Sequence, residues 1–86
     1  MAPRTVQPVP TLMRAGPYRF FVWSNEPPEP AHIHVESGGR HAKFWLDPVS
    51  LAKSDGYNPR EIARIHRLVE ANRGELRERW RDFFSN

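Results

Sequence analysis

Two adjacent glycines, Gly38 and Gly39, stand between two runs in which apolar and polar residues alternate. The two-residue turn that best fits a β-hairpin needs a positive φ at both positions, which glycine adopts without steric cost. So short a loop also sets the register, and residues 32–37 therefore pair with residues 40–46. The glycine pair predicts a tight hairpin as the central element of the fold.

In this register the hairpin has one apolar and one polar face. The apolar face consists of Ile33, Val35, Ala42, Phe44 and Leu46. The polar face, called here the histidine face, consists of His32, His34, Glu36, His41, Lys43 and Trp45. Glu36 lies opposite His41 on it, and His34 lies opposite Lys43. A shift of one residue would mix the two sets, so the alternation itself supports the register.

A helix is expected after the hairpin. Asn58 can cap it, Pro59 suits the first helical position, and Glu61 completes a capping box. From there apolar residues recur at helical spacing and keep one phase as far as Phe84. Because a break at Gly74 would reset that phase, we predict one helix from about Pro59 to Phe84, with a kink at Gly74 as the weaker alternative.

Shorter apolar segments complete a small sheet. Residues 11–14 suit an edge strand, residues 18–24 suit a strand rich in aromatic side chains, and residues 49–56 fit either a short strand or a turn. We therefore predict an α+β fold in which three or four antiparallel strands pack against one long C-terminal helix. The proline-containing residues 1–10 are expected to form a flexible arm, and residues 11–86 a single domain.

The composition excludes several classes of protein. The 86 residues allow one domain with a thin core, and the absence of cysteine excludes disulfides and cysteine-based metal or thiol chemistry. No apolar run is long enough to span a bilayer, and residues 1–10 lack the apolar core of a signal peptide. We expect a cytoplasmic protein without membrane contact, bound metal or cofactor.

The predicted helix is too long for the domain. About 26 residues in a helix span about 39 Å, whereas a compact domain of this size has a diameter of about 30 Å. The final turns, which carry Trp80, Phe83 and Phe84, should therefore extend beyond the sheet. Because exposed aromatic clusters mark contact surfaces, we predict that these three residues form an interface with a second copy of the chain or a small partner protein.

One interpretation of the histidine face is a metal site. His32, His34 and Glu36 provide two imidazoles and one carboxylate, a set that holds catalytic zinc or non-haem iron. Lys43 lies opposite His34 and argues against this interpretation, because a cation beside a divalent ion is costly.

The other interpretation is an acid–base site. His32, His34 and His41 can exchange protons near neutral pH, Glu36 can orient His41, and Lys43 can hold a phosphate oxygen. Metal-independent cleavage of RNA needs such a base, an acid and a cation.

Further residues fit contact with nucleic acid. Trp45 lies on the histidine face and can stack on a base, as Lys43 there can bind phosphate. Arg60, Arg64 and Arg67 form a stripe on the predicted helix, which fits either a phosphate track or an ordinary solvated face.

Several segments resemble a bacterial family of small proteins catalogued as domain of unknown function family 4160. They are Pro10–Leu12, Arg19–Trp23, Glu26–Val35, Ala42–Leu46 and Leu68–Arg73. The most specific part is a Pro-Pro-His-x-His-Val signature followed by Ala-Lys-Phe-Trp-Leu. The resemblance implies a cytoplasmic prokaryotic protein whose gene often lies beside another small gene, and some members look like toxin halves of type II toxin–antitoxin pairs.

One position departs from the family signature. Ala31 stands where a proline usually precedes the first histidine, and both histidines, His32 and His34, remain in place.

From the resemblance we predict a toxin-like component of a toxin–antitoxin pair that acts on RNA or translation through the histidine face. Its partner is expected to be a second copy of the chain or a small antitoxin-like protein. The alternatives are a non-catalytic protein-interaction module and a metal-dependent enzyme with His and Glu ligands.

Overall fold

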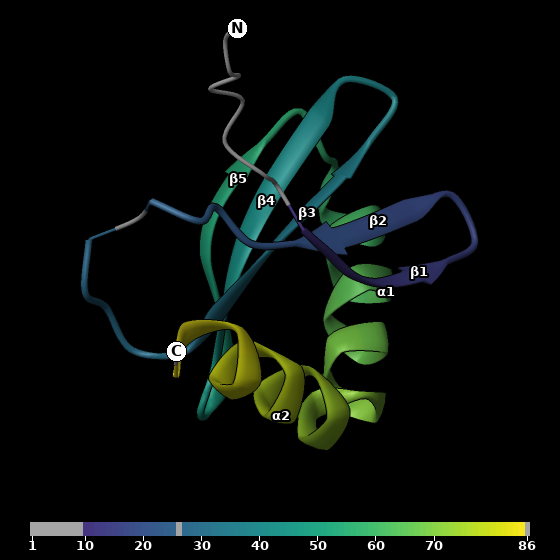
Figure 1. The fold of residues 1–86 in the computed structure, drawn as a ribbon. Helices are drawn as coiled ribbons and strands as arrows, with labels where there is room; N and C mark the ends of the chain where they lie inside the picture. Colours follow the sequence, from purple (N-terminus) through teal and green to yellow (C-terminus); the bar gives the residue numbers. More distant parts are fainter. Residues whose placement is uncertain (1–9, 26, 86) are drawn as a thin grey trace, which may run out of the picture.

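In residues 10–25 and 27–85, which are the part of the chain that this computed structural model describes, five antiparallel strands form one sheet (Figure 1). Each strand pairs with its neighbours in the chain, so the sheet order is the chain order. The strands are β1 (Thr11–Ala15), β2 (Tyr18–Phe21), β3 (His32–Ser37), β4 (Arg40–Leu46) and β5 (Val49–Asp55). Two helices follow, α1 (Pro59–Ala71) and α2 (Arg73–Phe84). The predicted α+β class is confirmed.

The β3–β4 hairpin has the predicted register. His34 pairs with Lys43, and Glu36 pairs with His41. Gly38 has a φ of 53° and Gly39 a φ of 80°, as a two-residue turn of this kind requires. The hairpin therefore separates its apolar and polar residues as the alternation indicates.

The sheet is larger than predicted. Residues 49–56, which fitted a strand or a turn, form the full strand β5, so the prediction of three or four strands was wrong. Of β5 only Val49 is buried, while its other residues are exposed. This strand is held by backbone pairing with β4 rather than by a buried face. Its sequence therefore lacks the sustained alternation of apolar and polar residues that predicts a strand. The predicted edge strand is confirmed as β1, and the arm predicted for residues 1–10 lies, apart from Pro10, outside the described residues.

The prediction of one long helix was wrong, because the helix ends at Asn72. The predicted cap at the start is confirmed: the Asn58 Oδ1 atom accepts a hydrogen bond from the Glu61 amide at 2.8 Å. At Asn72 the backbone leaves helical geometry, with φ −115° and ψ 17°, and its side-chain amide donates to the Leu68 carbonyl at 2.8 Å. A polar side chain that bonds the preceding turn competes with helix continuation. Gly74, the expected position of a kink, lies inside α2.

The break turns α2 sharply away from the direction of α1 and lays it beside the ends of the strands (Figure 1). The C-terminal turns consequently do not overhang the sheet. Trp80, Phe83 and Phe84 are partly buried and pack against the chain's own core. The interface predicted for these three residues stays a prediction. The reason given for it, that the last helical turns extend beyond the sheet, no longer holds.

The core lies between the apolar face of the hairpin and the two helices. Ile65 and Val69 of α1 and Leu76 of α2 are completely buried there, together with Phe44 of β4. Both faces of β2 are buried as well, since Phe20 and Phe21 are 0% and 1% exposed. In the described part of the chain neither helix has the length and apolar character needed to cross a bilayer.

Candidate functional site

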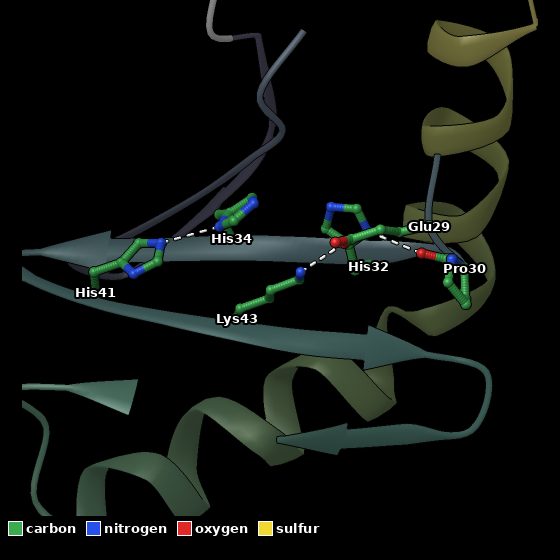
Figure 2. Close-up of polar contacts among 6 residues, drawn as sticks. All are labelled: Glu29, Pro30, His32, His34, His41 and Lys43. Carbon is green, nitrogen blue, oxygen red and sulfur yellow. Dashed lines mark hydrogen bonds and ion pairs between the residues drawn. The ribbon is translucent and has the colours of Figure 1, made fainter. Parts of the chain in front are cut away.

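The histidine face is largely shielded from solvent. His32 and His34 are 1% and 5% exposed, whereas a polar sheet face that only keeps a protein soluble is hydrated. Figure 2 shows their imidazoles on the same side of the hairpin as that of His41. Buried imidazoles need specific partners, because an unpaired buried polar group is costly. The partners define what this face can do.

His34 and His41 form a hydrogen-bonded pair. The Nδ1 atom of His34 lies 3.0 Å from the Nε2 atom of His41, and the two rings are stacked with their centroids 5.1 Å apart. One nitrogen must donate and the other accept, so at least one of these two atoms carries no proton. Cross-strand placement from β3 and β4 thus builds an imidazole pair that shares a proton, with His34 buried and His41 half-buried.

Aromatic rings cover the buried member of the pair. Phe21 stacks on His34 with a centroid distance of 5.5 Å, and Trp23 meets His34 edge-on at 6.1 Å. Trp23 is 41% exposed although it also contacts Phe21 at 5.6 Å. An exposed indole therefore borders the histidine pair. The sequence places Trp23 in a strand over residues 18–24, but β2 ends at Phe21. Trp23 is therefore a candidate contact residue at the strand end, which the predicted site residues did not include.

The other end of the face holds an ion pair. Lys43 donates to the Oε1 atom of Glu29 at 2.6 Å and lies over the ring of Trp45 at 4.7 Å (Figure 2). His32 donates from Nδ1 to the Pro30 carbonyl at 2.9 Å, because a carbonyl can only accept. Glu29 was also missed by sequence reasoning. It belongs to a proline-rich segment without periodicity, and its proximity to Lys43 arises from the tertiary path of that segment.

Glu36 bonds to a residue other than the predicted one. Its Oε2 atom accepts from Arg19 Nη1 at 2.7 Å, although its backbone partner across the hairpin is His41. Arg19 also donates to Thr11 Oγ1 at 2.7 Å and lies over the Phe21 ring at 4.6 Å. Glu36 therefore orders the arginine on β2, while His41 bonds to His34.

The helical arginines do not join this face. Helix α1 packs against the opposite, apolar face of the hairpin through Ile65 and Val69, so the sheet separates Arg60, Arg64 and Arg67 from the histidines. The predicted sites thus fall into two groups. The structure brings together His32, His34, His41, Lys43 and Trp45 and keeps the arginine stripe apart.

The residues of the metal interpretation do not converge. In residues 10–25 and 27–85, no group of three or more His, Asp or Glu side chains is placed to hold a metal ion. His32 and His34 bond to a carbonyl and to another imidazole, and Glu36 bonds to an arginine. The donor set in this part of the chain fits proton exchange better than metal binding.

Comparison with known protein families gives a match over most of the chain. The family described as "Domain of unknown function (DUF4160)" matches residues 18–81, which run from the start of β2 into α2 and include every residue of the histidine face. No curated protein and no solved structure matches the chain.

Proposed function

We propose, from the premise that this chain belongs to the DUF4160 family, that it is a toxin-like member of a type II toxin–antitoxin pair and cleaves RNA at its histidine face. The toxin-like role follows from the family resemblance. The chemistry rests on one observation, the hydrogen bond between His34 and His41 beside the exposed ring of Trp23.

The bonded pair suits both halves of RNA cleavage. When His41 donates through Nε2 to His34, its Nδ1 is free of a proton and acts as a base. His41 then takes the proton of a ribose 2′-hydroxyl, the 2′-oxygen bonds to phosphorus, and the bond from phosphorus to the 5′-oxygen breaks. The proton passes from His41 to the departing 5′-oxygen, which leaves a 2′,3′-cyclic phosphate and a 5′-hydroxyl. His34 is a positioning residue, since it accepts the second N–H of the charged His41 ring.

Cations and an aromatic ring complete the site. Lys43 is the backbone partner of His34, and Lys53 of β5 is the partner of Lys43, so two lysines lie in neighbouring positions on adjacent strands. Lys43 is paired with Glu29, whereas Lys53 is exposed, so in this proposal Lys53 supplies the positive charge for a phosphate. Trp23 supplies a stacking surface for a base beside the scissile phosphate. A small antitoxin-like protein that covers this face would block access to RNA.

The test compares two half-buried histidines. His41→Ala should lower RNA cleavage at least 100-fold, the lower range for losing a general acid or base, and should abolish growth arrest on induced expression. His66→Ala removes an imidazole from α1, on the other side of the sheet, and should leave both unchanged. Cleavage should also survive EDTA.

Three outcomes would contradict the proposal. Full cleavage by His41→Ala rejects the acid–base pair. Activity lost with EDTA and restored by zinc or manganese favours the metal-dependent alternative. Intact RNA together with normal growth on expression of the wild-type chain favours a non-catalytic interaction module.

A further inference from the structure

A cavity lies at the end of the histidine face, between the proline-rich segment and α2. Its volume is about 320 Å³, and its lining residues are Pro27, Pro28, Glu29, His32, Trp80 and Phe84. This volume is at the lower end of the range for small-ligand pockets. Prolines and aromatic rings form most of its walls. The rings of Trp80 and Phe84 contact each other with a centroid distance of 4.8 Å and planes tilted by 47°. Such walls suit a planar ring.

The polar atoms of the wall narrow the choice of ligand. Glu29 uses Oε1 to bind Lys43, and its Oε2 makes no hydrogen bond with a described residue. A carboxylate offers about four acceptor sites, so Glu29 can still accept two parallel N–H donors. Trp80 has an indole nitrogen that is buried and has no hydrogen-bond partner in the described chain. That nitrogen is inaccessible to a water-sized atom, so it offers a ligand no hydrogen bond. The carboxylate of Glu29 is therefore the polar group that selects the ligand.

Among the RNA bases, guanine alone matches this pattern. Its N1–H and its 2-amino group form two adjacent donors, which a carboxylate accepts in the strong bidentate, charge-assisted manner. Adenine and cytosine place one amino donor next to a ring acceptor, and uracil flanks one donor with two acceptors, so each sets an acceptor against the carboxylate.

We propose that this cavity is a guanine-binding pocket, in which Trp80 and Phe84 form one aromatic wall against which the base packs and Glu29 selects the base. The inference rests on the proposed function, in that the ligand is RNA, and it assigns the base next to the cleavage site. Glu29 connects the two, because Lys43 bridges from its carboxylate to the strand that carries His41.

The test measures binding of mononucleotides to the full chain by calorimetry, which needs no cleavage. Guanosine monophosphate should bind at least tenfold more tightly than adenosine, cytidine or uridine monophosphate. Inosine monophosphate, which lacks only the 2-amino group, should fall between them. Glu29→Gln should remove the preference, because an amide offers only one acceptor group.

Two neighbouring phenylalanines give a matched control. Phe84 lines the cavity and Phe83 does not, although both are partly buried on α2. Phe84→Ala should weaken guanosine monophosphate binding about tenfold, within the range for losing one stacking partner, while Phe83→Ala should not. Equal binding of the four nucleotides, or equal effects of the two variants, would overturn the inference.

Separate results would contradict the proposed RNA cleavage and the proposed guanine pocket. His41→Ala should retain the guanine preference, since His41 does not line the cavity. A guanine preference with His41-independent cleavage overturns the proposed reaction alone. Cleavage that depends on His41 without any base preference in binding overturns the guanine pocket alone.

Discussion

At the scale of single residues, burial decides what each histidine can contribute. His32 and His34 point away from the apolar core as the alternation indicates, yet they are almost completely buried. Removal of His34 would take away the ring stacked on Phe21 and the imidazole bonded to His41. His41 is the half-buried member of the pair, so its substitution separates chemistry from folding more cleanly.

A buried tyrosine makes stability depend on pH. Burial, followed by the hydrogen bond to the Glu61 carboxylate, raises the pKa of Tyr18 above its ordinary value of 10.0. The unfolded chain therefore loses this proton at lower pH than the folded chain, and unfolding is favoured as pH rises. This contribution is fully present below about pH 10 and is lost as pH rises through the folded pKa.

Urea unfolding of the wild type should accordingly show stability that declines above about pH 10. Tyr18→Phe should reduce the slope of that decline, because phenylalanine has no proton to lose. Tyr57→Phe serves as a comparison, since burial also raises the pKa of Tyr57. An unchanged slope in Tyr18→Phe would contradict the assignment.

At the scale of elements, two glycines with opposite roles make a matched pair. Gly39 has a φ of 80° in the hairpin turn, whereas Gly74 lies in α2, and a Cβ atom at either position would contact nothing within 4 Å. Any effect of a side chain there therefore comes from the backbone and not from a clash.

Gly39→Val should destabilise the protein by about 1–3 kcal/mol, because a β-branched residue resists a positive φ. Gly74→Ala should stabilise it by about 0.5–1 kcal/mol, since alanine loses less backbone entropy in a helix. Thermal unfolding of both variants measures whether the stability falls in Gly39→Val and rises in Gly74→Ala. A stabilising Gly39→Val would mean that the turn does not hold its left-handed conformation.

The helix break is the other feature at this scale. Asn72 lies on the same arc as the apolar residues, so the periodicity continues through it and predicts one helix. The hydrogen bond from its side chain to Leu68 is visible only in three dimensions. The turn at Asn72 lets Leu76 reach the core and places Trp80 beside His32, with ring centroids 6.2 Å apart.

At the scale of the whole molecule, α2 links the core to the histidine face. Leu76 is completely buried, and Trp80 is partly buried against the core and lines the proposed guanine pocket. Arg79, between them in the next turn, donates to the Leu12 carbonyl of β1 at 2.8 Å. Helix α2 is thus held by the core and by the backbone of β1.

Trp80→Ala should therefore lower the free energy of unfolding by about 2–4 kcal/mol. This loss is somewhat smaller than for a fully buried tryptophan, because Trp80 is only partly buried. Sedimentation equilibrium beside urea unfolding distinguishes this outcome from the interface predicted on the sequence. If Trp80→Ala dissociated an oligomer and left the unfolding of the monomer unchanged, α2 would serve a partner rather than its own core.

The sequence alone determined what depends on near neighbours. The glycine pair and the strict alternation around it sufficed for the hairpin register, because a two-residue turn permits one pairing and a slip would bury polar side chains. Asn58 and Glu61 sufficed for the start of α1, because a cap is made within one turn. The family resemblance likewise rests on contiguous segments, and it is confirmed over residues 18–81.

Only the tertiary structure decided which groups meet across the chain. Glu29 reaches Lys43 and Arg19 reaches Glu36 through the folding of segments 14 and 17 residues apart, and no periodicity encodes such distances. The same holds for the turn at Asn72, which brings Trp80 to His32. The hydrophobic effect that drives these approaches is non-directional. A local pattern therefore predicts which face of an element is buried. Which polar groups lie together depends on how the whole chain packs.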